Sequence, residues 1–292
     1  MTIPKLKLQL KLRILGVGAL AIGGLGFHLL APASAQKPPT SAPSSSQAVK
    51  LAPYVLILPG SAVKVQMLPV PGGTIKIGTK AVLVKPFYMA RTETPWEAFD
   101  VFIASGAPSP SYDQTVFPAD AIARPSKSYI LPDLGWGHNG YPAINLSFTT
   151  TEMCCRWLAS ATGKKYRLPT EAEWEFACRA GAQGVIKMDK AQLEKTAWYA
   201  GNSETVTHPV GKKLPNKYGL YDMYGNVGEW ATDLEGKPIL CGGTFLDEPS
   251  GISPTKRQRW TPKWQETDPQ FPKSRWWLAD GKFVGFRFVC EP

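Results

Sequence analysis

The chain has 292 residues, 27 glycines, 27 prolines, ten tryptophans and a formal net charge of +10. This composition favours a loop-rich fold in which large rings hold irregular backbone, and it argues against a helical bundle or a doubly wound sheet. Four basic residues and no acidic residue lie within residues 1–35, which leaves +6 for the rest; because the basic residues there are mostly scattered, we expect no nucleic-acid partner.

Residues 1–35 have the pattern of a secretory signal peptide. Four basic residues precede an apolar run at 14–30, and Ala33-Ser34-Ala35 forms a small-residue cleavage site. The apolar run is also about long enough to span a bilayer, so an uncleaved N-terminal anchor is the alternative. In both cases the sequence predicts export to a periplasmic or extracellular location. Residues 36–50 are rich in proline and serine and predict a linker, which leaves 51–292 as the folded domain.

Strands, turns and long loops make up much of this domain. A turn at Pro71–Gly73 leads into a strand in which Ile75 and Ile77 alternate with other residues. Further strands are expected within 49–58, 206–210, 240–245 and 283–290, and at Phe87–Ala90. The segments 107–146 and 246–282 are long and irregular, and such loops are usually functional or held in place by their own aromatic residues.

Three helices are predicted from their capping signals. Each begins after a threonine that is followed three residues later by a glutamate, which is the pattern of a capping box. The pairs are Thr94 with Glu97, Thr149 with Glu152, and Thr170 with Glu173. Glycine ends the first two helices, at Gly106 and Gly163. On the third helix Glu175 and Arg179 are spaced to pair on the solvent face, so we interpret its carboxylates as caps and ion pairs rather than acid–base groups.

Residues 216–233 are dense in glycine, asparagine, aspartate and aromatic residues, and they show neither a helical nor a strand period. Such a segment folds only if something other than regular hydrogen bonding holds it, and a bound cation is the usual solution. An ordinary turn with solvated carboxylates is the alternative. The sequence therefore marks this segment as a candidate cation site.

Five blocks of the sequence together resemble the formylglycine-generating enzyme family, also called the sulfatase-modifying factor domain. The most specific block includes Arg167 to Gly181 and reads RLPTEAEWEFACRAG there. Other blocks begin at Pro71, Glu93, Pro215 and Gly242. The resemblance covers roughly residues 67–289. It implies an α+β, C-type-lectin-like single domain with short helices, a small antiparallel sheet and much irregular loop.

The resemblance also implies a structural calcium site. In the family the ligands are a side-chain oxygen at the position of Asp222, the carbonyl oxygens of Gly225 and Val227, and the carboxylate of Glu229. Calcium takes about six to eight hard oxygen ligands, so this set suits its chemistry. A second calcium site in the family involves an asparagine that matches Asn202, but the acidic residue expected downstream has no clear counterpart in this chain.

The resemblance does not extend to the oxidase centre. The enzymes that make formylglycine carry two copper-binding cysteines in the loop after the block at Gly242, whereas residues 242–289 contain no cysteine. We therefore expect neither copper nor cysteine oxidation. Among the five cysteines, the resemblance pairs Cys155 with Cys290 in a disulfide, and Cys178 with Cys241 is a further candidate pair; the alternative is that all five are buried thiols.

The sequence thus predicts an exported, calcium-stabilised binding or accessory module. Loop 246–282 is the expected ligand surface, because its tryptophans and basic residues suit contact with a peptide or a glycan. The candidate contact residues are Arg257, Arg259, Trp260 and Trp276. The alternative is an oxidoreductase, of the formylglycine-generating type or with another metal, that acts on a protein or a small molecule. A membrane partner is expected only if the N-terminal segment is not cleaved.

Overall fold

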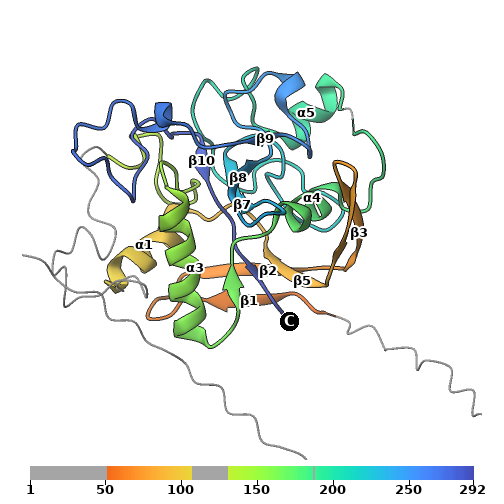
Figure 1. Cartoon of the computed structure of the whole chain (residues 1–292), viewed down its shortest axis with the longest axis horizontal. Helices are drawn as coiled ribbons and strands as arrows, with labels where there is room; N and C mark the ends of the chain where they lie inside the picture. The colour runs from red at the N-terminus through yellow and green to blue at the C-terminus, as the bar shows by residue number, and fades with distance from the viewer. Residues whose placement is uncertain (1–50, 107–130, 187) are drawn as a thin grey trace, which may run out of the picture. The chain divides into compact units, whose positions relative to one another are not determined.

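The computed structural model describes residues 51–106, 131–186 and 188–292 (Figure 1). The predicted signal peptide at 1–35 and the linker at 36–50 lie outside these ranges, and so do residues 107–130 of the first long loop. In the part of the chain that the structure describes, no helix is both long and apolar enough to cross a membrane.

Five strands from distant parts of the chain form the main sheet. Their order is β1-β2-β5-β11-β6, and every neighbouring pair is antiparallel. The strands span Tyr54–Ile57 (β1), Lys64–Val70 (β2), Phe87–Ala90 (β5), Tyr166–Arg167 (β6) and Val289–Cys290 (β11). The strand predicted at Phe87–Ala90 is confirmed. Strand β2 is an addition to the predicted set, because Pro69 near its end obscures the alternating pattern.

A second sheet of four strands supports the segments on which the candidate site is built. Its order is β10-β7-β8-β9, with β10 and β7 parallel and the other pairs antiparallel. The strands span Gly228–Thr232 (β7), Pro238–Cys241 (β8), Arg257–Gln258 (β9) and Val284–Gly285 (β10), while β3 (Gly73–Ile77) and β4 (Lys80–Val84) form a separate hairpin. The strand predicted within 206–210 is wrong, since His208 and Val210 donate their backbone N–H groups to Asn226 and Gly140 instead.

Four α-helices and two 3₁₀ helices lie within the described residues. They span Trp96–Ser105 (α1), Phe148–Thr162 (α3), Glu171–Arg179 (α4), Lys190–Thr196 (α5), Pro249–Gly251 (η1) and Pro262–Gln265 (η2). The capping box on α4 is confirmed: Glu173 donates its backbone N–H to Thr170 Oγ1 at 3.2 Å, and Thr170 returns a bond to the Glu173 carboxylate at 2.8 Å. Gly106 and Gly163 end α1 and α3 with φ values of 62° and 68°, as predicted.

The capping boxes predicted for α1 and α3 are wrong. Thr94 makes no cap on α1, which begins after Pro95, and Glu97 instead accepts a hydrogen bond from the backbone N–H of Gly140 at 2.8 Å. On α3 the cap is Ser147, whose hydroxyl accepts from the backbone N–H of Thr150 at 3.2 Å. Glu97 therefore ties α1 to the loop at 131–141 rather than closing its own helix.

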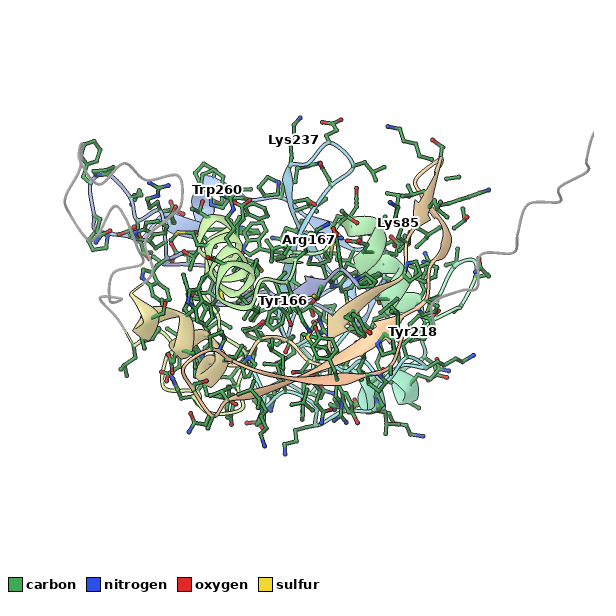
Figure 2. All side chains as sticks on the ribbon, turned by 90° about the horizontal axis from the view of Figure 1, so that it is seen from below. Lys85, Tyr166, Arg167, Tyr218, Lys237 and Trp260 are labelled. Atoms are coloured by element: carbon green, nitrogen blue, oxygen red, sulfur yellow. The ribbon has the colours of Figure 1, made fainter. Side chains whose placement is uncertain are left out.

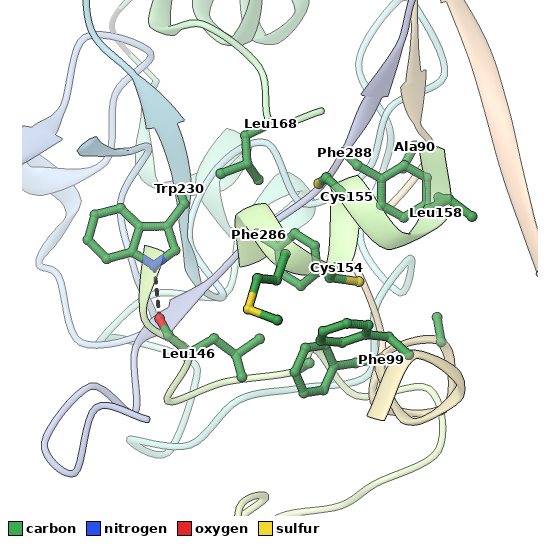
Figure 3. Packing of buried hydrophobic residues seen from close by; sticks show 14 of the residues in the cluster. Ala90, Phe99, Leu146, Cys154, Cys155, Leu158, Leu168, Trp230, Phe286 and Phe288 are labelled. Atoms are coloured by element: carbon green, nitrogen blue, oxygen red, sulfur yellow. Dashed lines mark hydrogen bonds between the residues drawn. The ribbon is translucent and has the colours of Figure 1, made fainter. Parts of the chain in front are cut away.

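Large aromatic rings fix the irregular segments to the core (Figure 3). Trp230 of β7 is buried, and its indole N–H donates to the carbonyl oxygen of Leu146 at 2.9 Å. Phe99 of α1 packs edge-on against Phe286, which lies between β10 and β11. Residues of α3 such as Leu158 belong to the same cluster. This arrangement of short helices, small sheets and ring-pinned loops confirms the predicted α+β class.

All five cysteines are buried free thiols, so the disulfide expected between Cys155 and Cys290 is not formed. Cys155 projects from α3 into the apolar core (Figure 3). The thiol of Cys290 lies against the hydroxyl groups of Tyr54 and Tyr166, which are 2.9 Å apart. Burial raises the pKa of Cys155 well above its ordinary value, so this thiol is not a nucleophile at neutral pH.

Candidate functional site

The turn before β7 has a carboxylate with one unsatisfied oxygen. Asp222 is buried, and its Oδ2 accepts a hydrogen bond from the backbone N–H of Gly211 at 2.7 Å. Its Oδ1 is buried without any hydrogen-bond partner in the described part of the chain. Three residues later Gly225 has a φ of 71°, and a Cβ there would lie 2.0 Å from the carbonyl oxygen of Trp198. Only glycine fits this turn, which fixes the backbone that follows Asp222.

Glu229, the second predicted carboxylate ligand, is held by a buried arginine. Arg287 donates to Oε1 at 2.6 Å and to Oε2 at 2.7 Å, and the indole N–H of Trp174 donates to Oε2 at 2.7 Å. A carboxylate has about four acceptor positions, so these three bonds leave about one position free on Oε1. The sequence patterns did not indicate that Trp174 or Arg287 belongs to this site.

A third buried carboxylate belongs to the same group and lies far from it in the sequence. Glu93 accepts from the backbone N–H of Val227 at 2.9 Å and from the amide of Asn226 at 2.6 Å. Burial, followed by the nearby charges of Asp222 and Glu229, raises the pKa of Glu93 well above its ordinary value. Glu93 therefore fixes the turn through its hydrogen bonds with Asn226 and Val227. The sequence patterns did not indicate this role for Glu93.

These residues fit a divalent cation. Burial, which outweighs the hydrogen bond from Gly211 and the charge of Arg287, raises the pKa of Asp222 to about 6. The raised pKa of Glu93 favours its neutral form, so the carboxylates of Asp222 and Glu229 exceed the single guanidinium of Arg287 by one negative charge, which favours a bound cation. No three Asp, Glu, His or Cys side chains within 51–106, 131–186 and 188–292 form a metal-binding group. A calcium ion would therefore depend on Asp222 and Glu229 together with the carbonyl groups of Gly225 and Val227.

A small cavity reaches this region from outside. Its volume is about 260 Å³, and its lining includes Asp222, Met223 and Tyr224. Asn202, the residue that matches the second calcium site of the family, uses its amide elsewhere. Its Oδ1 accepts from the backbone N–H of Tyr199 at 2.9 Å, and its Nδ2 donates to the Ala197 carbonyl at 3.1 Å. These contacts hold the turn that follows α5.

Arg257 fastens the start of loop 246–282 to α4. Its guanidinium contacts Glu171 at 3.1 Å and Glu175 at 2.6 Å, and its side chain is 17% exposed. Arg179 also pairs with Glu175, at 2.8 Å, so this predicted pair exists but faces inward instead of toward solvent. In the sheet, Arg257 lies opposite Cys241, which lies opposite Glu229. Arg257 is therefore a structural residue and not a free ligand contact.

The other predicted contact residues divide into exposed and buried ones. Arg259 is 57% exposed and pairs with Asp233 at 2.7 Å. Trp260 is 46% exposed, and Figure 2 places it well apart from Lys85 of the β4–β5 turn. Trp276 is only 1% exposed, so its prediction as a surface contact is wrong: its ring belongs to the core. Phe271, which was not among the candidates, is fully exposed at 100%.

Known proteins with similar sequences point to one family. A family model described as the sulfatase-modifying factor enzyme 1-like domain matches residues 47–291. The mouse formylglycine-generating enzyme is 27% identical over 221 residues, which cover 58% of this chain and 58% of the mouse protein. The bovine inactive C-alpha-formylglycine-generating enzyme 2 is 35% identical over 129 residues, 38% of this chain and 40% of the bovine protein. The chain thus matches less than two thirds of either relative.

Solved structures with the same fold include two bacterial proteins. Treponema denticola variable protein 1 aligns with a TM-score of 0.59 and 20% identity, covering 83% of this chain and 100% of the other. PvdO from Pseudomonas aeruginosa aligns with a TM-score of 0.57 and 23% identity, covering 78% of this chain and 94% of the other. At these identities the likeness shows the fold alone.

Proposed function

The chain belongs to the sulfatase-modifying factor enzyme 1-like domain family, and from this membership we propose that it is an exported, calcium-stabilised binding or accessory module. One observation carries the proposal. Residues 242–289 contain no cysteine, whereas the formylglycine-generating enzymes that this chain resembles bind copper through two cysteines in that region. Similarity to a bovine protein that is itself named inactive supports a role without oxidase chemistry.

The calcium part of the proposal is supported by the unpartnered oxygen of Asp222. A buried carboxylate oxygen without a hydrogen-bond donor is unfavourable, and a cation would satisfy it. When bound, the ion would hold the turn in place and neutralise its carboxylates; it would do no chemistry on a substrate. Asp222 and Glu229 would be its side-chain ligands, and Glu93 would hold the backbone of the turn behind them.

The binding part of the proposal is supported by the exposed side chains of loop 246–282. Trp260 and Phe271 present large apolar rings to solvent, although such rings are ordinarily buried. Arg259 adds a cation two residues from the buried anchor Arg257. Exposed aromatic and guanidinium groups on an anchored loop suit a peptide or glycan ligand. The N-terminal segment supports export.

Arrays of peptides and glycans would test this function. The full-length protein should bind a subset of either array, and Trp260→Ala should reduce the signal strongly. Leu83→Ala is the matched control, since Leu83 is an exposed apolar residue of the β3–β4 hairpin, outside the loop. Binding that Leu83→Ala and Trp260→Ala weaken equally would contradict the assignment of the surface.

The oxidoreductase alternative has a separate test. Copper-loaded protein in an oxygen electrode should consume no oxygen above background when cysteine-containing peptides are supplied. Steady oxygen uptake that requires the peptide would overturn the proposal of a module without cysteine-oxidase activity.

A further inference from the structure

His138 lies between two carboxylates from different parts of the fold. Its Nε2 is 2.7 Å from Oδ2 of Asp100 on α1, and its Nδ1 is 2.9 Å from Oδ2 of Asp133. The ring also stacks on Trp96, with centroids 5.4 Å apart and planes inclined by 17°. An ionised carboxylate only accepts hydrogen bonds, so both contacts are hydrogen bonds only when both ring nitrogens carry protons. The geometry is that of a charged imidazolium.

The hydrogen bond to Asp100 fastens the loop at 131–141 to α1, while the hydrogen bond to Asp133 lies within the loop. The same loop is tied to this helix by Gly140, which donates its backbone N–H to Glu97 at 2.8 Å. The backbone N–H of Trp96 donates in turn to the carbonyl oxygen of Tyr141 at 2.9 Å. His138 supplies the side-chain link between the middle of the loop and the helix.

Trp136, two residues before His138, contacts both ends of loop 246–282. Its ring packs edge-on against Phe245, with centroids 5.6 Å apart. The ammonium group of Lys282 lies 5.8 Å from the centroid of the same ring. Phe245 directly precedes the loop and Lys282 is its last residue, so the position of Trp136 is linked to both ends of the loop.

We propose that protonated His138 is a latch that holds Trp136 against the two ends of loop 246–282, and that loss of the proton opens this latch. In the deprotonated ring only one nitrogen can donate, so either Asp100 or Asp133 loses its hydrogen bond. The 131–141 loop then loses one of its attachments to α1 or one of its internal bonds. We expect ligand binding to weaken as a consequence, and this expectation rests on the proposed function. The existence of the latch does not depend on that function.

The charges around His138 determine whether a rise or a fall in pH breaks its hydrogen bonds. Burial alone would lower the pKa of His138, but the hydrogen bonds and charges of Asp100 and Asp133 outweigh it and raise the pKa. Glu97 on α1 is a further carboxylate against this loop, where it accepts the backbone N–H of Gly140. A raised pKa means that the latch is fully closed below the ordinary histidine value of about 6.5 and opens as the pH rises through the raised value.

Hydrogen–deuterium exchange on the full-length protein tests the latch without any ligand. After correction for intrinsic rates, amides of residues 134–141 should open up to about fivefold more often at about pH 9 than at about pH 6, the factor expected from losing one ion pair between groups as exposed as His138 and Asp100. His138→Gln should exchange at the faster rate at both pH values. Asp100→Asn should lower the pH at which the loop loosens.

Glu152→Gln is the matched control, because Glu152 is an exposed helical carboxylate that pairs with Arg156 at 2.9 Å on α3. It should keep the wild-type pH dependence of the 134–141 amides. Exchange that does not vary with pH in the wild type, or a His138→Gln variant that retains the wild-type dependence, would overturn the latch. Because no ligand is needed, these outcomes are distinct from a failure of the array experiment.

Discussion

Arg257 and Arg259 lie two residues apart, yet their removal should have very different effects on stability. The guanidinium of Arg257 pairs with Glu171 and Glu175, which are both buried. Removing one partner of a buried ion pair leaves an uncompensated charge, at a cost of about 3–5 kcal/mol. We expect Arg257→Ala to lower the free energy of unfolding by about 3 kcal/mol. This is the lower end of that range, because Glu175 keeps its second partner, Arg179.

Arg259→Ala is the matched control for this prediction. Arg259 is 57% exposed, and Asp233, although buried, keeps hydrogen bonds from the backbone N–H groups of Glu235 and Lys237. We therefore expect loss of this exposed arginine to cost no more than about 1 kcal/mol. Urea unfolding measures both losses in the free energy of unfolding, because each follows from the shift of the urea midpoint when the m-value is unchanged. At about 2–4 °C per kcal/mol, the melting temperature should fall by about 6–12 °C in Arg257→Ala and by no more than about 4 °C in Arg259→Ala.

A double variant separates the lost charge from the lost packing. If the cost of Arg257→Ala comes from stranded carboxylates, adding Glu171→Gln should cost less than the sum of the two single variants. Equal losses in Arg257→Ala and Arg259→Ala would refute the reasoning, and so would strict additivity in the double variant.

Three further predictions test other parts of the structure. Calcium should raise the melting temperature of the wild type, by the equivalent of about 2.7 kcal/mol at about one hundred times its Kd; calorimetry with calcium or EDTA should detect little response in Asp222→Ala, which removes the side-chain oxygen, and a full response there would remove the site. Trp276→Ala should cost about 3–5 kcal/mol in urea unfolding because its ring is buried, whereas Trp260→Ala should change stability by less than about 0.5 kcal/mol; similar losses would contradict their assigned burial. Burial opposes ionisation of Glu173, but its bonds with Arg167 outweigh this and lower its pKa, so its contribution is present above about pH 4.3 and lost as the pH falls through the lowered value. The difference in stability between the wild type and Glu173→Gln should therefore shrink in acid, and a constant difference would argue against the ion pair.

Local chemistry explains which helix boundaries could be predicted from the sequence. Thr170 has a glutamate at capping-box spacing, and the box forms together with the ion pair that Arg167 of the preceding strand makes with the same carboxylate. At α3, both Ser147 and Thr149 are chemically able to cap. The choice of Ser147 is made by the far end of the chain, where its hydroxyl donates to the carbonyl oxygen of Arg275 at 2.6 Å. Contacts between residues so far apart in the sequence cannot be predicted from the local sequence pattern.

The same limit applies to the candidate site. The resemblance placed Asp222 and Glu229 near one turn because both lie in one short segment. Glu93 escaped prediction because it comes from the residues before α1 and meets the turn only in the folded chain. Trp260 and Trp276 are chemically alike in the sequence, and only their contact with the core separates an exposed ring from a buried one.

The way in which loop 246–282 is attached has a consequence for how such a domain diversifies. Arg257, Trp264 and Trp276 are its buried or largely buried fixing points, whereas Trp260 and Phe271 lie between them and face solvent. Substitutions at these exposed positions leave the packed interior unchanged, so they change the outer chemistry at little cost in unfolding free energy. A lineage of these domains can therefore change the exposed sequence of this loop while its scaffold stays the same. For the same reason, the exposed stretches around Trp260 and Phe271 are the natural places to graft new sequences in the laboratory.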